Sequence, residues 1–156
     1  MKAIVVGAGE VGYHLADRLS KEGHDVTIVE RNPAREKFLH DKVNASVVLG
    51  SGASAEVLEA AGIQKAELFV ALTDIDEVNM FACMLAREYN VPHKIARVSN
   101  VEYTRGNSKL NAEKLGIELL INPRYVVADE ICEMVEYTYA VDAAEFADGR
   151  VVFLGY

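Results

Sequence analysis

Residues 2–12 read Lys-Ala-Ile-Val-Val-Gly-Ala-Gly-Glu-Val-Gly, and this stretch decides the fold. The apolar run Lys2–Val6 is typical of a short strand buried on both faces. Val11, Leu15 and Leu19 follow at the spacing of a helix. Between strand and helix, the glycines form the pattern GxGxxG, which is informative only in that context. The first glycine permits a tight turn, the second lets a phosphate approach the backbone, and the third lets helix and strand pack closely.

The glycine loop is therefore predicted to bind a pyrophosphate, because the free N–H groups and the positive end of a helix would face such a ligand. The alternative is a glycine-rich turn without a ligand. The predicted loop residues are Gly7, Ala8, Gly9, Glu10, Val11 and Gly12.

Outward from this stretch, strand-like and helix-like segments alternate along the chain. Strands are expected at Lys2–Val6, Asp25–Glu30, Ser46–Leu49, Leu68–Leu72, Lys94–Val98 and Glu118–Ile121. Helices are expected at Glu10–Lys21, from Asn32-Pro33 onward, at Ser54–Ala61, Asp76–Tyr89 and Glu102–Leu115, and from Pro123 to about Tyr139. This alternation predicts an α/β protein with a Rossmann-type, doubly wound, parallel six-stranded sheet.

The end of the chain has a different pattern. Val141–Phe146 and Arg150–Leu154 flank Ala147-Asp148-Gly149, which predicts a hairpin with an Asp-Gly turn. A lone hairpin is only marginally stable in water, so it must pack on something else. We therefore divide the chain into a nucleotide-binding domain at residues 1–140 and a C-terminal hairpin extension at residues 141–156.

Composition and charge argue against several other classes of protein. The 156 residues are 51% hydrophobic and 26% charged, the mix of a globular domain. The formal charge is −8, and no Lys/Arg run offers the basic face of a nucleic-acid binder, so no nucleic-acid partner is expected. No apolar run approaches the roughly 20 residues that span a bilayer, so no direct membrane insertion is expected. Cys83 and Cys132 lack metal-ligand spacing and are expected to be buried thiols in a reducing compartment; no metal site is expected.

Glu30 ends the second expected strand, where a carboxylate can accept hydrogen bonds from both hydroxyls of an adenosine ribose. An acid there disfavours a 2′-phosphate and so favours NAD over NADP, although Arg31 and Arg35 weaken that preference. ATP, ADP and AMP carry the same ribose, so Glu30 cannot choose among them. The alternative is a solvated acid at a strand end.

Further candidates lie on the same edge of the expected sheet. Thr73 and Asp74 follow the fourth strand, where they could contact the ribose or the second half of a dinucleotide. Alternatively, Asp74 or Asp76 merely caps the fourth helix. Arg97 ends the fifth strand, where its guanidinium could reach a phosphate or pair with Asp74.

Taken together, these residues resemble the nucleotide-binding subdomain of the RCK/KTN family. Gly7–Gly12 with Glu30 gives the fingerprint, and Val70-Ala71-Leu72-Thr73-Asp74 with Asn79 resembles the family's "TxxDexN" block. The segment from Gly50-Ser51-Gly52 to Ala61-Gly62-Ile63 resembles its "GDxxxxxxLxxAGI" block, with Ser51 where the family usually has Asp. The matching segments extend from residue 1 to about residue 140.

The resemblance implies a non-enzymatic regulatory subunit that binds a nucleotide and gates an integral-membrane potassium transporter subunit. It would be cytoplasmic and peripheral to the inner face of the cell membrane through that partner. The family also implies a homo-oligomer, a dimer or tetramer in a ring-like assembly. Since the family usually continues into a second, regulatory subdomain, residues 141–156 are expected to be the start of a truncated one.

The expected helix from Pro123 is a candidate for pairing two copies. Its apolar residues include Tyr125, Val126, Ile131, Met134 and Val135. Alternatively, the same residues simply cover the sheet.

Two other functions are weighed against the regulator. A small NAD-dependent oxidoreductase needs a substrate domain or a Tyr-x-x-x-Lys pair, and the sequence has no such pair. A nucleotide or redox sensor of another assembly, such as a transcriptional repressor, would need a DNA-binding module, which is not visible. As the cofactor we favour NAD(H), with ATP or ADP possible at the same site, because the carboxylate of Glu10 in the phosphate loop would repel the extra charge of a γ-phosphate.

Overall fold

The computed structural model describes residues 1–104, 111–136, 142–146 and 151–155. By their internal contacts the residues form two units, Met1–Asn122 and Pro123–Tyr156, and each is described by itself. This division lies at a different place from the predicted domain boundary at residue 140, which assigns the helix after Pro123 to the first domain. The predicted boundary concerns the family's domains and stays a prediction.

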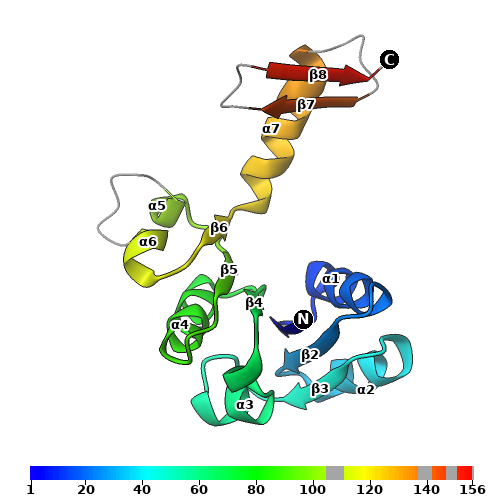
Figure 1. Cartoon of the computed structure of the whole chain (residues 1–156), viewed down its shortest axis with the longest axis vertical. Coiled ribbons are helices and arrows are strands. Elements are labelled where there is room, and N and C mark those ends of the chain that lie inside the picture. The colour runs from blue at the N-terminus through cyan, green and yellow to red at the C-terminus, as the bar shows by residue number, and fades with distance from the viewer. Residues whose placement is uncertain (105–110, 137–141, 147–150, 156) are drawn as a thin grey trace. The chain divides into compact units, whose positions relative to one another are not determined.

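The first unit is built on a parallel sheet of six strands in the order β3-β2-β1-β4-β5-β6 (Figure 1). The strands are β1 Lys2–Val6, β2 Asp25–Glu30, β3 Ser46–Leu49, β4 Leu68–Ala71, β5 His93–Arg97 and β6 Leu119–Ile121. In the centre of the sheet, Val5 lies opposite Ile28 on one side and Val70 on the other. The order reverses between β1 and β4, and ligands of such sheets bind beside the carboxyl ends of the strands at this point. The predicted Rossmann-type sheet is confirmed.

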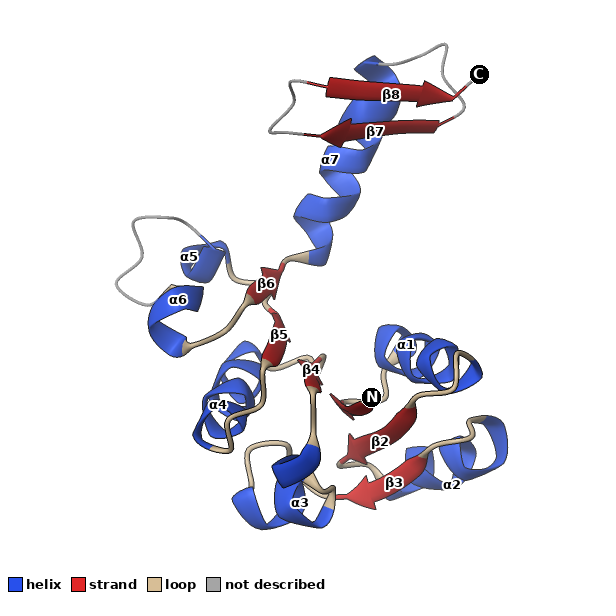
Figure 2. Ribbon diagram, in the orientation of Figure 1, coloured by secondary structure: helices blue, strands red, loops and turns tan. Residues whose placement is uncertain are grey.

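Helices connect these strands (Figure 2). They are α1 Glu10–Lys21, α2 Pro33–Lys42, α3 Ala55–Ala60, the 3₁₀ turn η1 Ile63–Lys65, α4 Asp76–Glu88, α5 Val101–Thr104 and α6 Ala112–Leu115. Local chemistry fixes where they begin. The side chain of Asn32 accepts a hydrogen bond from the N–H of Ala34 (2.9 Å) ahead of Pro33, and Ser54 caps α3 in the same way.

The core lies on both faces of the sheet, which explains why β1 is continuously apolar. Val5 packs in one cluster with Ala16 of α1 and Leu39 of α2. Ile4, one position away in the strand, packs in the other cluster with Leu58 of α3 and residues of α4. Because side chains alternate along a strand, β1 supplies both layers and is buried between them.

The predicted helix Glu102–Leu115 is wrong as a continuous element. Residues 105–110 lie outside the described part of the chain. Beyond them Asn111 has extended backbone angles (φ −117°, ψ 167°), and its side chain accepts a hydrogen bond from the N–H of Lys114 (3.0 Å). Asn111 therefore starts a separate helix, because an N-cap residue cannot lie inside a helix.

The second unit contains α7 Pro123–Glu136 and an antiparallel pair, β7 Asp142–Phe146 with β8 Val151–Gly155. The two strands confirm the predicted hairpin. Its expected Asp148-Gly149 turn and the expected helix end at Tyr139 lie outside the described residues. Cys132 of α7 is exposed while Cys83 of α4 is buried, so the prediction of two buried thiols is wrong for Cys132.

Candidate functional site

A cleft of about 280 Å³ lies where the sheet order reverses. Its walls are the loop after β1, the end of β2 with the start of α2, the loop after β3 and the loop after β4. The lining residues are Val6, Gly7, Ala8, Gly9, Val29, Glu30, Arg31, Asn32, Arg35, Gly50, Ser51, Gly52, Leu72, Thr73, Asp74, Ile75 and Val78.

Two glycines of the loop, Gly7 and Gly12, lie against other backbone atoms too closely for a side chain. A Cβ on Gly12 would lie 1.9 Å from the carbonyl oxygen of Gly7, so α1 can pack onto the turn only with glycine there. Gly7 has φ +90°, and a Cβ on it would meet the backbone nitrogen of Thr73 at 3.0 Å. Sequence reasoning assigned these two roles to these two glycines, and the geometry agrees.

Gly9 differs from both because it faces open space. A Cβ on Gly9 would meet only the Nη1 of Arg35, at 3.9 Å. Gly9 is also the N-cap of α1 and supplies no side-chain hydrogen bond to the first turn. The first N–H groups of a helix have no partners within the helix, so here they are available to an anion in the cleft.

Glu30 holds the glycine loop against the end of β2. It is only 7% exposed, which rules out the alternative of a solvated strand-end acid. Its Oε2 accepts a hydrogen bond from the N–H of Ala8 and its Oε1 accepts one from the N–H of Asn32, both at 2.8 Å. A carboxylate has about four lone-pair positions, so Glu30 retains capacity to accept from a ribose hydroxyl.

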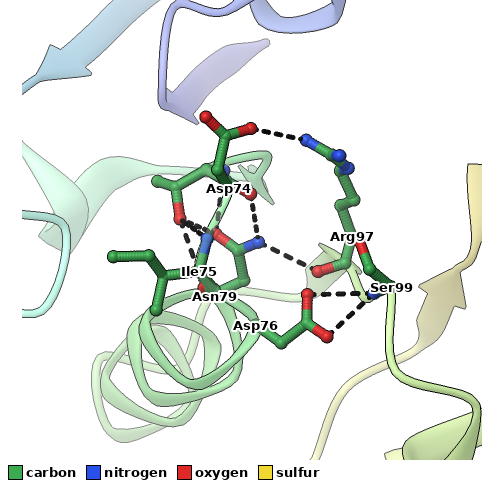
Figure 3. A network of polar contacts seen from close by, with 7 residues as sticks. Asp74, Ile75, Asp76, Asn79, Arg97 and Ser99 are labelled. Carbon is green, nitrogen blue, oxygen red and sulfur yellow. Dashed lines mark hydrogen bonds and ion pairs between the residues drawn. The ribbon is translucent and has the colours of Figure 1, made fainter.

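A buried asparagine organises the opposite wall (Figure 3). The Oδ1 of Asn79 accepts hydrogen bonds from the N–H and the hydroxyl of Thr73, at 2.9 and 2.7 Å. Its Nδ2 donates to the carbonyl oxygens of Thr73 and Arg97, both at 2.9 Å. Asn79 thus ties the ends of β4 and β5 together, and the hydroxyl proton of Thr73 is used within the loop.

Two acidic residues near this wall, Asp74 and Asp76, make contacts with β5 and the loop after it. Asp74 accepts a hydrogen bond from the Nη1 of Arg97 at 3.1 Å, with the Asp74 side chain 92% exposed. Asp76 accepts from the N–H groups of Ser99 and Asn100, at 2.9 and 2.8 Å, and so holds the loop after β5. Neither carboxylate caps α4, whose N-cap is Ile75 without a side-chain bond.

Not every predicted site residue lines the cleft. Those that do are Gly7, Ala8, Gly9, Glu30, Arg31, Thr73 and Asp74. Glu10 and Val11 are exposed at the start of α1, Gly12 lies in the packing beneath the loop, and Arg97 lies beside Asp74.

From the sequence alone, Arg35 counted only as a charge near Glu30, and no binding role was given to Asn32 or the loop Gly50–Gly52. A signal for that loop existed, because a Gly-Ser-Gly run directly follows a strand whose carboxyl end meets the same edge. A Cβ on Gly52 would lie 2.2 Å from the Cγ1 of Val6, so the loop after β3 lies directly against β1.

Metal binding and membrane insertion both have recognisable structural requirements. No group of three or more His, Cys, Asp or Glu side chains in the described ranges could hold a metal ion. No helix in that part of the chain is long and apolar enough to cross a membrane.

Comparison with known proteins places these features in a family. The profile of the TrkA-N domain matches residues 3–123. The Trk system potassium uptake protein TrkA of Haemophilus influenzae is 42% identical over 153 residues, which cover 97% of this chain and 33% of that protein. The chain spans about a third of the length of the curated relatives it matches.

Solved structures share the fold. The TrkA-N domain of the inner membrane protein ybaL from Escherichia coli has a TM-score of 0.75 at 19% identity, covering 86% of this chain and 96% of that one. The GsuK channel bound to NAD has a TM-score of 0.73 at 19% identity, covering 94% of this chain and 25% of that one. GsuK bound to ADP has a TM-score of 0.66 at 20% identity, covering 88% and 34%. The chain described here belongs to the TrkA-N domain family.

Proposed function

We propose that this chain is the nucleotide-binding part of a regulatory protein that gates a membrane potassium uptake system. The observation that carries the proposal is the cleft at the switch point, which is lined both by Gly9, at the open N-terminus of α1, and by the buried Glu30. This combination suits a ligand that carries both phosphate and ribose. The potassium uptake assignment is supported by relatives named for that system.

The ligand class is an adenine nucleotide, with NAD(H) as the preferred member and ATP or ADP as competitors at the same site. Two solved structures that share this fold, GsuK bound to NAD and GsuK bound to ADP, support both ligand types as candidates. Glu10 is exposed at the first position of α1 and does not line the cleft, so solvent screens its repulsion of a γ-phosphate. We expect a preference of about tenfold for NADH over ATP, reduced or reversed in Glu10→Arg.

A chain of hydrogen bonds beside the cleft supports a route by which a bound nucleotide could influence the chain after β6. Asp76 accepts from the N–H of Ser99, and the Nδ2 of Asn122 donates to the Ser99 carbonyl oxygen at 3.2 Å. Asn122 directly precedes Pro123, the first residue of α7. A nucleotide acts as a switch only when it binds two arrangements of the protein with different affinity, so the proposal is a population shift between arrangements of paired copies.

The proposal includes a homo-oligomer, a dimer or tetramer, that docks on an integral-membrane potassium transporter at the cytoplasmic face and performs no catalysis. Exposed apolar residues of α7 support pairing through this helix: Tyr125, Val126, Val127, Ile131, Met134 and Val135. It also includes the predicted division into a nucleotide-binding domain, residues 1–140, and a hairpin, residues 141–156, that begins a regulatory subdomain.

Native mass spectrometry tests binding and assembly together. The wild-type chain should be observed as an oligomer carrying an adenine nucleotide. Gly9→Val should lose the nucleotide and keep its melting temperature, because a side chain at Gly9 extends into open cleft rather than into packed atoms. A monomeric protein without nucleotide, or full occupancy of Gly9→Val, would refute the proposal.

A further inference from the structure

Arg35 reaches across the cleft from α2 to the glycine loop. It lies in the first turn of α2 and lines the cleft. Its Nη1 is 3.9 Å from the position that a Cβ on Gly9 would occupy. The guanidinium is therefore in contact range of the space in front of the N-terminus of α1.

Within the described part of the chain, the guanidinium of Arg35 has no hydrogen-bond or salt-bridge partner; the backbone N–H of Arg35 donates to the carbonyl oxygen of Asn32. The acids that line the cleft are already engaged. Glu30 accepts from two backbone N–H groups, and Asp74 pairs with Arg97. No carboxylate of the described residues forms an ion pair with the Arg35 guanidinium, so its charge remains available to a ligand.

The position of Arg35 is unfavourable for α2 itself. A cation in the first turn of a helix opposes the helix dipole, which costs about 0.3–1 kcal/mol at an exposed site. Here the positive end of α1 lies opposite as well, at Gly9. An unpaired guanidinium beside two positive helix ends makes a strong local attraction for an anion.

We propose that Arg35 binds phosphate and sets the preference of this site for ligands with two linked phosphates. This inference rests on the proposed nucleotide function. In this arrangement the N–H groups at the start of α1 bind one phosphate. The guanidinium of Arg35, which lies beside them, binds the phosphate linked to it. A nucleoside diphosphate or a dinucleotide makes both contacts, whereas a nucleoside monophosphate makes one.

Lys37 provides a matched control on the same helix. It is exposed and does not line the cleft, and its side chain has no hydrogen-bond or salt-bridge partner among the residues the structure describes. Lys37→Gln therefore removes the same unit of charge from α2 without touching the glycine loop. Arg35→Lys keeps the charge and removes the planar, two-pronged donor.

Calorimetric titrations with adenosine, AMP, ADP and NADH measure the effect on wild type and the three variants. In the wild type, ADP and NADH should bind at least tenfold more tightly than AMP. Arg35→Gln should lower the affinity for ADP and for NADH at least tenfold and change the affinity for AMP less than threefold. It should also reduce the salt dependence of ADP binding. Arg35→Lys should recover part of the loss, and Lys37→Gln should bind as the wild type does. Thermal melts of all variants confirm folding, and Arg35→Gln should melt no lower than wild type.

The outcomes separate this inference from the proposed function. If the wild type binds adenine nucleotides but Arg35→Gln leaves the ratio of ADP to AMP affinity unchanged, the role of Arg35 is refuted and the nucleotide function stands. An equal loss in Lys37→Gln would also refute it, since the effect would then be one of overall charge. If the wild type binds none of the four compounds, both are refuted.

Discussion

Replacing Asn79 with Ala should destabilise the protein more than any comparable change at an exposed asparagine. The side chain is fully buried and makes four hydrogen bonds, three of them to backbone groups of Thr73 and Arg97. Alanine would remove all four and leave the Thr73 N–H and the Arg97 carbonyl without their partner, next to a small cavity.

The expected size of the loss follows from these contacts. A hydrogen bond contributes about 1 kcal/mol net, and a buried group left without a partner costs about 1–3 kcal/mol. The hydroxyl of Thr73 can return to water because Thr73 is half-buried, so its bond contributes little to the loss. We expect the free energy of unfolding to fall by about 3 kcal/mol, which for a chain of this length lowers the melting temperature by about 6–12 °C.

Urea denaturation followed by circular dichroism measures this loss directly. Asn44→Ala is the control, because Asn44 is exposed and its side chain has no hydrogen bond within the described residues. Asn44→Ala should change the free energy of unfolding by no more than about 0.5 kcal/mol. A loss below about 1 kcal/mol for Asn79→Ala, or losses of equal size at both positions, would show that this network does not hold the ends of β4 and β5.

Three further changes test other parts of the structure. Gly12→Ala should unfold the protein or lower its free energy of unfolding by several kcal/mol in a urea titration, because the added Cβ would lie 1.9 Å from the carbonyl oxygen of Gly7. A variant as stable as the wild type would refute this packing of α1. Asp74→Ala should change the free energy of unfolding by less than about 1 kcal/mol, since the Asp74 side chain is 92% exposed; a larger loss in the same titration would contradict this. Burial raises the pKa of the Cys83 thiol to about 12. Ellman's reagent at pH 8 should therefore react with the exposed Cys132 and leave Cys83 unlabelled until urea is added. Fast labelling of both thiols would refute the burial of Cys83.

The central strands and the first loop could be predicted because each depends on a local pattern. A continuous apolar run such as Lys2–Val6 suits a strand covered on both faces, and β1 is covered on both faces. The spacing of Gly7 and Gly12 encodes a contact between residues five apart in the chain, and the structure places those two backbones against each other. Local spacing was sufficient in these cases because the partners are near neighbours in sequence.

Prediction failed where the outcome depends on a single cap or on distant partners. The apolar spacing over Glu102–Leu115 suits a helix, but one capping side chain, Asn111, starts a new one. The role of Asn79 was not predicted, because one of its partners, Arg97, ends a different strand, β5. A buried asparagine on an otherwise apolar helix face is nevertheless a usable signal, since an amide is buried only where its hydrogen bonds are made.

The polar contacts of the cleft also decide which of its parts can respond to a ligand. Glu30 and Asn79 already fix the loops after β1 and β4 through backbone hydrogen bonds, so a nucleotide need not order these loops on binding. Preorganisation of this kind lowers the entropic cost of binding. The groups that remain free to change partners are the charged side chains at the rim, chiefly Arg35 and Asp74, which is paired with Arg97. A nucleotide can shift the protein between two arrangements only through contacts that differ between them. We therefore expect such a difference to arise first at these rim side chains, because the buried hydrogen bonds beneath them are already made without a ligand.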